Sequence, residues 1–240
     1  MTVLLEARDL SVGYGEVAVI HELDLEVRAG EIVVLLGPNG AGKTTTMLTL
    51  AGELVPTSGE VFWRGEPTTS PLHQRAKDGL ALITEERSVF MNLTVAENLR
   101  VGGADHSALE SFPELQPLLR RRAGLISGGE QQILTVARAL ARSPQVILAD
   151  ELSLGLAPLV VRRLLHALKE AAQKGVGVLV VEQHIHEALA FADRVYVLRQ
   201  GRVEFSGSVD EARDNLVKIE SSYFAGGDAS DADAQATAQS

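Results

Sequence analysis

The chain has 240 residues, of which 45% are hydrophobic and 22% are charged, an ordinary composition for a soluble protein with a sizeable core. Its net charge of −10 argues against nucleic acid as a partner, and the absence of cysteine fits a reducing compartment. The longest apolar runs have five residues, a bilayer-spanning helix needs about 20, and the N-terminus lacks a signal-peptide pattern, so we expect a cytoplasmic protein.

Two segments near the N-terminus alternate apolar and polar residues, as half-buried strands do. They span Val3–Val12 and Glu22–Val27, with Gly13, Tyr14 and Gly15 predicted as a turn between them. The Tyr14 ring fits two roles, core filling or stacking on a nucleotide base. Its position upstream of a phosphate-binding motif favours stacking.

That motif has the pattern G-x-x-x-x-G-K-[ST] and stands between a buried-type strand at Glu31–Leu36 and a helix at Thr44–Ala51. Glycines let successive backbone N–H groups turn toward one point, where the helix N-terminus adds partial positive charge. Lys43 can reach the β- and γ-phosphates, and the Thr44 hydroxyl suits Mg²⁺. We therefore expect a nucleoside triphosphate to bind through Gly37, Pro38, Asn39, Gly40, Ala41, Gly42, Lys43, Thr44 and Thr45.

A third buried-type strand is predicted at Gly79–Thr84, followed by a capping box in which Thr94 and Glu97 open a helix. Residues 101–125 show little periodicity, and the arginine run at 120–122 is interpreted as a solvated face rather than a binding site.

The stretch Ser127, Gly128 and Gly129 stands just before an amphipathic helix at Gln131–Ala141. Small residues at a helix start expose N–H groups in the positive field of the helix dipole, which predicts a second anion-binding site. The same three residues are also common in plain turns, so the motif is modest by itself.

Two carboxylates, Asp150 and Glu151, end the apolar strand Gln145–Ala149. Such a strand is suited to deliver Asp150 as a Mg²⁺ ligand of the Walker B type, beyond the sheet edge where the phosphate loop lies. Glu151 is suited to polarise the water that attacks the γ-phosphate. The alternative is a surface Asp-Glu pair, which the upstream phosphate loop makes the weaker interpretation.

His184 follows another buried-type strand, Gly177–Val181, and is expected at the same sheet edge as Asp150, near the γ-phosphate. A helix at 158–174 links the two strands, which is typical of a parallel sheet. A hairpin is predicted at 195–206. Residues 224–240 are rich in Ala, Asp, Gly, Gln and Ser and are predicted to be a disordered tail.

Together these motifs resemble those of ABC-type ATPases over residues 3–222. The resemblance implies an α/β P-loop NTPase with a mostly parallel central sheet, an N-terminal antiparallel β subdomain and an inserted helical subdomain at about 88–144, in a domain spanning 1–222. It implies ATP and Mg²⁺ as cofactors, with Lys43, Glu151 and His184 catalytic and Tyr14 stacked on adenine. Ser127, Gly128 and Gly129 would contact the γ-phosphate of ATP on the opposite subunit of a head-to-tail dimer, and residues 153–156 would cross the interface.

Three further stretches are similar to ATP-binding subunits of branched-chain amino acid importers of the LivF type: Glu130–Gln132, Ser153–Val161 and Val181–Gln183. This resemblance implies a second ATP-binding subunit, transmembrane permease subunits and, indirectly, a solute-binding protein. It places the chain on the inner face of the plasma membrane. ATP-binding subunits of importers of urea and amides share much of these sequence motifs, so those solutes remain an alternative.

Several positions depart from the ABC pattern. Glu85 stands where a glutamine is usual, and it stays a candidate for contact with Mg²⁺ and the nucleotide. Leu152 replaces a proline and Ala157 an aspartate. The region between Asn98 and Ser127, which by resemblance meets the permease, is somewhat short. These departures keep open an ATP-gated binding module with weak turnover, beside a soluble ABC ATPase that has no membrane partner.

Overall fold

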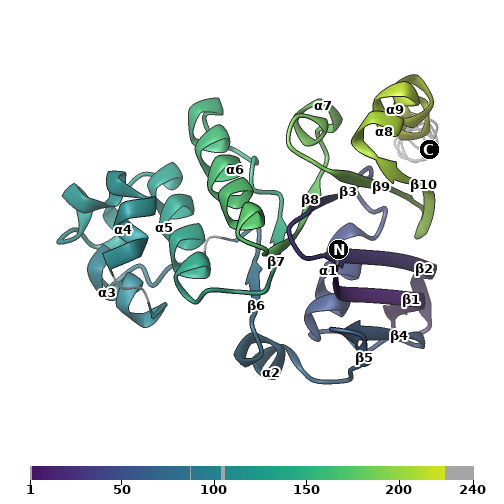
Figure 1. The fold of residues 1–240 in the computed structure, drawn as a ribbon, viewed down its shortest axis with the longest axis horizontal. Coiled ribbons are helices and arrows are strands. Elements are labelled where there is room, and N and C mark those ends of the chain that lie inside the picture. Colours follow the sequence, from purple (N-terminus) through teal and green to yellow (C-terminus); the bar gives the residue numbers. More distant parts are fainter. Residues whose placement is uncertain (1, 87, 104–105, 225–240) are drawn as a thin grey trace, which may run out of the picture.

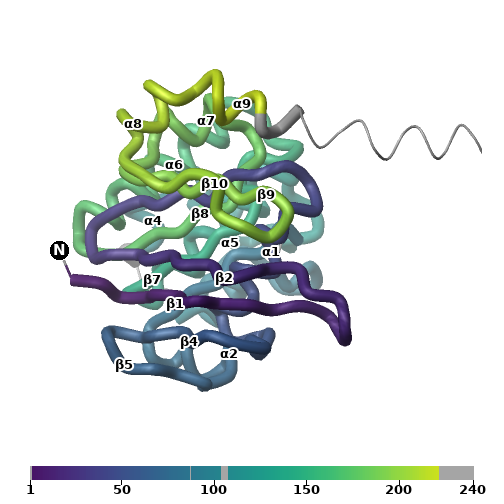
Figure 2. Tube along the Cα trace, turned by 90° about the vertical axis from the view of Figure 1, so that its right-hand side faces the viewer, coloured from purple at the N-terminus to yellow at the C-terminus, as the bar shows by residue number. Residues whose placement is uncertain are grey.

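Two β-sheets organise the chain, of which the computed structural model describes residues 2–86, 88–103 and 106–224. The first sheet is antiparallel, with strand order β2-β1-β4-β5. Its long strands cross the molecule side by side (Figure 2). The bounds are Val3–Tyr14 for β1, Val17–Arg28 for β2, Ser58–Trp63 for β4 and Glu66–Pro67 for β5.

The second sheet has strand order β10-β9-β3-β8-β7-β6 and is parallel except for β10 at its edge. All residues of β3, β7 and β8 are buried, as expected for strands covered on both faces. The bounds are Ile32–Leu36 for β3, Leu80–Ile83 for β6, Val146–Asp150 for β7, Gly177–Glu182 for β8, Arg194–Arg199 for β9 and Arg202–Ser208 for β10.

Helices cover this sheet and add a separate lobe, formed by α3 to α5 between β6 and β7 (Figure 1). The α-helices are α1 (Lys43–Ala51), α2 (Leu72–Lys77), α3 (Val95–Val101), α4 (His106–Ser111), α5 (Gly128–Ala141), α6 (Pro158–Gln173), α7 (Ile185–Leu189), α8 (Val209–Asp214) and α9 (Leu216–Phe224). Two 3₁₀ helices, η1 (Pro113–Leu118) and η2 (Ala123–Leu125), complete the lobe.

The core has two layers because successive residues of a strand point to opposite faces. Ile32, Val34 and Leu36 of β3 belong to the layer that packs against α5 and α6. Val33 and Leu35 belong to the other layer, where α1 and the antiparallel sheet close over the same strand. Helix α1, and with it the phosphate loop, therefore lies between the two sheets.

The predicted strands and long helices are present, with differences at their ends. Tyr14 ends β1 instead of lying in the turn, because it pairs directly with Val17. Helix α5 begins at Gly128, three residues before the predicted start. The predicted hairpin is formed by β9 and β10 around Gln200 and Gly201, whose positive φ angles of 46° and 76° fit a tight two-residue turn.

The tail predicted to be disordered begins at Phe224, the last residue of α9. Residues 225–240 lie outside the described residues, so that prediction stays a prediction. Within the described part of the chain, each helix is too short or too polar to cross a bilayer.

Candidate functional site

The phosphate loop has the open backbone that an anion requires. Gly40 and Gly42 have φ angles of 78° and 101°, in the left-handed region that glycine adopts readily. Gly42 is the N-cap of α1 and no side chain caps that helix, so its first N–H groups are left for a ligand. Gly37 packs so closely that a Cβ would lie 2.4 Å from the carbonyl oxygen of Leu198.

The Lys43 ammonium is held inside its own loop. Its Nζ donates to the carbonyl oxygens of Gly37 at 2.9 Å and Pro38 at 3.1 Å, and the residue is only 5% exposed. Burial lowers the pKa of Lys43, while the negative charges of Glu151 and Asp150 oppose this shift. A phosphate bound above the loop is the natural counter-charge for this amine.

Asp150 faces the start of α1 from the end of β7. Its Oδ2 accepts a hydrogen bond from the Thr44 hydroxyl at 3.0 Å, and the residue is 4% exposed. Burial raises the pKa of Asp150, the Thr44 hydrogen bond opposes the shift, and the charges of Glu151 and Glu85 add to it. The structure therefore places Glu85, which is exposed, within electrostatic reach of Asp150.

These residues fit Mg²⁺. Within the described residues, Asp150 Oδ1 is buried without a hydrogen-bond partner, a cost that a cation would remove. Mg²⁺ is usually held by one or two carboxylates together with substrate phosphates, so Asp150 and the Thr44 hydroxyl are a sufficient protein set. Bound there, the ion would neutralise charge on the phosphates.

A cleft of about 190 Å³ lies beside the loop, and a second one of about 250 Å³ adjoins it. Glu151 lines both of them. Sequence reasoning missed Val19, on β2, in the first cleft, and assigned no role to Gln132, in the second with Glu85. Gln132 is 3% exposed and its Oε1 has no partner among the described residues, which no local pattern would have indicated.

Glu151 is held in an uncommon backbone conformation, with a φ of 44°. Its N–H donates to the Val181 carbonyl at 3.0 Å, and its carboxylate accepts a hydrogen bond from the Gln183 amide. Leu152 is 1% exposed and belongs to the core. The buried side chain of Leu152 anchors the turn directly after Glu151.

Three parts of the predicted site are not joined to this cleft. Ser127 caps α5 in the helical lobe, accepting from the Glu130 N–H at 3.3 Å, and Gly129 packs near Val160. His184 is the exposed N-cap of α7, and its side chain bonds to no other described residue. Tyr14, 53% exposed, ends β1 at the hairpin with β2, the strand that carries Val19.

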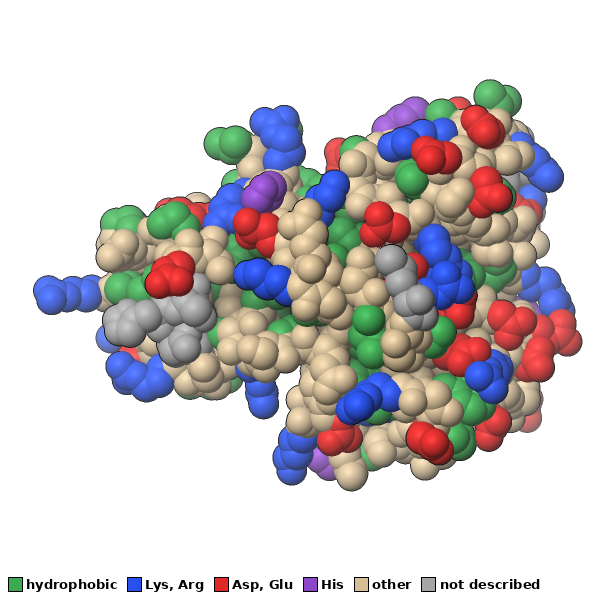
Figure 3. Space-filling model, viewed as in Figure 1, with side chains coloured by type: hydrophobic (Ala, Val, Ile, Leu, Met, Phe, Trp, Pro, Cys, Tyr) green, Lys and Arg blue, Asp and Glu red, His purple; other side chains and the backbone are tan. Residues whose placement is uncertain are grey.

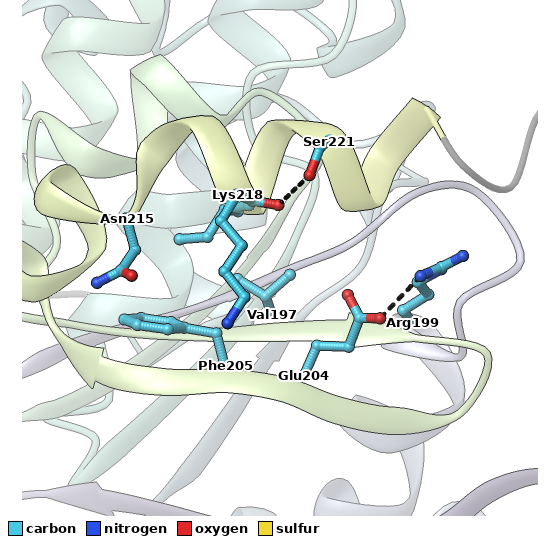
Figure 4. A pocket seen from close by; sticks show the side chains of 8 residues that line it. Val197, Arg199, Glu204, Phe205, Asn215, Lys218 and Ser221 are labelled. Carbon is cyan, nitrogen blue, oxygen red and sulfur yellow. Dashed lines mark hydrogen bonds and ion pairs between the residues drawn. The ribbon is translucent and has the colours of Figure 1, made fainter.

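A larger cavity of about 330 Å³ lies elsewhere, between the β9–β10 hairpin and α9 (Figure 4). Phe205 and Val197 form its floor, and the Lys218 side chain extends toward it from α9. Arg199 and Glu204 pair with each other at 2.9 Å on its rim. None of the predicted site residues lines this cavity, so we do not assign the chemistry to it.

A loop of free N–H groups between β3 and α1, with a buried carboxylate opposite it at the end of β7, defines a P-loop nucleoside triphosphatase. The family model described as ABC transporter matches residues 20–153. The chain belongs to this family and is one of its ATP-binding, ATP-hydrolysing subunits.

Relatives and a solved structure agree with this assignment. The chain is 40% identical to the branched-chain amino acid transport protein BraG of Pseudomonas aeruginosa, over 83% of this chain and 91% of the relative. It is 36% identical to the probable LivF of Archaeoglobus fulgidus, covering 87% and 93%. The lipopolysaccharide export protein LptB of Acidithiobacillus ferridurans is 34% identical, covering 90% and 94%. A solved ATP-binding subunit of an ABC transporter has a TM-score of 0.78 at 30% identity, covering 89% and 93%.

Proposed function

We propose that this ATPase powers the import of branched-chain or related amino acids as a peripheral subunit on the inner face of the plasma membrane. The observation that carries the proposal is the 40% identity to BraG, which spans 91% of that relative. Two residues of the stretches that suggested this branch in the sequence meet Glu151: Gln132 lines the second cleft with it, and Gln183 donates a hydrogen bond to its carboxylate.

In this proposal each predicted site residue has one task. The N–H groups at the start of α1 and the Lys43 ammonium bind the phosphates, and Thr44 and Asp150 hold Mg²⁺. Glu151 lines the cleft beside the phosphate loop and orients the attacking water, taking up its proton. His184, at the same sheet edge, contacts the γ-phosphate. Tyr14 offers an exposed ring to the adenine.

The site of one chain is half of a complete site. Ser127 is exposed at the start of α5, and no hydrogen bond or ion pair among the described residues joins it to the phosphate loop. Two chains arranged head to tail would place Ser127, Gly128 and Gly129 of each over the nucleotide of the other. This arrangement makes hydrolysis depend on closure of the dimer.

A groove of about 590 Å³ is a suitable docking site for a permease subunit. It lies between α2, β6, α3 and α5, where the helical lobe meets the parallel sheet. Lys77, Arg138 and Arg142 line it, together with Val101, which is 55% exposed. The Arg138 guanidinium lies 5.0 Å from the ring centre of Phe90, itself half exposed. A cytoplasmic permease segment with apolar and acidic side chains would match this lining.

Export of a lipopolysaccharide component is the second candidate, because LptB matches at 34% identity over 94% of its length. The two candidates differ in the permease that the groove would receive and in the cargo. Both use the same ATPase site.

Uptake measurements in the native host separate them. The gene is deleted and restored on a plasmid as wild type or as Glu151→Gln, and uptake of labelled leucine and labelled urea is measured. Import of amino acids predicts loss of leucine uptake that the wild type restores and the variant does not. Normal leucine uptake with defective surface lipopolysaccharide would support the second candidate instead, and loss of urea uptake alone would change the solute.

A further inference from the structure

The end of β8 holds the segment after β7 at three points. The Glu151 N–H donates to the Val181 carbonyl at 3.0 Å. The Ser153 hydroxyl donates to the Glu182 carboxylate at 3.1 Å. The Gln183 side-chain amide donates to the Glu151 carboxylate. Residues 181–183 thus bind residues 151–153, and we call these three contacts the β7–β8 clamp.

The clamp is rigid because its centre is buried. Glu182 is 2% exposed and Leu152 is 1% exposed, so the middle of each segment is fixed in the core. Glu182 also accepts the N–H of Gln183 at 3.3 Å, which orients the residue that reaches Glu151. A left-handed φ of 44° at Glu151 persists only where surrounding contacts determine the backbone, as they do here.

Within the described residues, Gln183 supplies the one side-chain hydrogen bond to the Glu151 carboxylate. Lys43 acts on that carboxylate by charge alone, since its own hydrogen bonds go to Gly37 and Pro38. Gln183 does not line the cleft beside the phosphate loop. The contact with Glu151 is therefore what links this amide to the cleft.

We propose that Gln183 is a positioning residue for ATP hydrolysis, whose amide aims the Glu151 carboxylate into the cleft beside the phosphate loop. This inference rests on the proposed role of Glu151 in hydrolysis. A carboxylate on a flexible side chain samples several rotamers, and a fixed hydrogen bond selects one of them.

Gln183→Met tests the proposal kinetically, because methionine keeps the length of the side chain and removes the donor. Loss of this alignment should lower kcat about tenfold, which corresponds to about 1.4 kcal/mol of activation free energy. The KM for ATP should stay within about twofold, because the amide does not touch the nucleotide cleft. Gln173→Met, the same change on the exposed face of α6, is the matched control and should leave both constants unchanged. A normal kcat for Gln183→Met would overturn the inference.

A stability cycle tests the contact without hydrolysis. Thermal unfolding of the full chain is measured for wild type, Gln183→Glu, Glu151→Gln and the double variant at pH 7.5. Gln183→Glu sets two carboxylates against each other and should lower Tm by about 2–4 °C, the shift that follows from about 1 kcal/mol in a chain of this size. In the Glu151→Gln background the new carboxylate meets an amide donor, so most of the loss should disappear.

Equal losses of Tm in both backgrounds would show that the two side chains do not interact, and the inference fails. Wild-type turnover by Glu151→Gln, with the coupling present, would instead remove the catalytic role of Glu151 while leaving the contact intact. The two experiments therefore separate the failure of this inference from the failure of the proposed function.

Discussion

Gly42→Ala tests how the antiparallel sheet shapes the phosphate loop. An ideal Cβ at Gly42 would lie 2.3 Å from Ile20 Cδ1 on β2, and the φ of 101° is one that side chains rarely adopt. The left-handed backbone costs about 1–2 kcal/mol, and overpacking against the fully buried Ile20 adds about 1–3 kcal/mol. We expect the free energy of unfolding to fall by about 2–5 kcal/mol in the absence of nucleotide.

Two further variants divide this cost. Gly40→Ala has a φ of 78° with nothing within 4 Å of its Cβ, so it should show the backbone cost alone, about 1–2 kcal/mol. Ile20→Val removes the very methyl group that the new Cβ meets, at a cost of about 0.5–1.5 kcal/mol by itself. Combined with Gly42→Ala, it should relieve part of the clash. The double variant should therefore lose about 1 kcal/mol or more less unfolding free energy than the sum of the two single variants.

Urea unfolding gives these values directly, with Trp63 as the single tryptophan reporter beside the core layer that contains Ile20. The reasoning fails if Gly42→Ala lowers the free energy of unfolding no more than Gly40→Ala does, or if the effects of Ile20→Val and Gly42→Ala are additive. Either result would show that the close contact between β2 and the loop does not restrict the side chain at position 42.

Three other outcomes are expected. Glu151→Gln should slow hydrolysis by about 10²–10⁴-fold, the usual contribution of a general base, while ATP still drives dimerisation in sedimentation; unchanged turnover would remove its role. Ala157 is the N-cap of α6 and offers no capping side chain, so Ala157→Ser should raise the free energy of unfolding in urea by about 0.5–2 kcal/mol. The contrasting variant Ser153→Ala should lower it. Burial raises the pKa of Glu182, so its contribution to stability is complete at low pH and is lost as the pH rises above 4.5 through the raised pKa. Urea unfolding measured over this pH range should show the wild type losing stability relative to Glu182→Gln. Stability curves that run parallel with pH for the two proteins would contradict this.

Local patterns sufficed for the elements whose signals are local. The apolar run of β3 predicted a buried strand, and those of β7 and β8 predicted central parallel strands, because strands covered on both faces have no polar side. The capping box at Thr94 is present with both hydrogen bonds. Short helices such as α2 and α7 were missed because five or six residues show too little periodicity. Helix α8 has a readable local signal, because Ser208 and Glu211 form a capping box at its start.

The sequence by itself determined the phosphate loop and the carboxylate opposite it, because a strand, a glycine-rich turn and a helix start lie within a few residues of each other. The contact of Thr44 with Asp150 could be expected from that motif pair, and the structure has it. Only the tertiary structure decided what surrounds Glu151. The order of strands in a sheet is set by packing between distant segments, and it places β8 beside β7 and so Gln183 on Glu151. The same packing folds Ile20 of β2 over Gly42, a contact that no local spacing encodes.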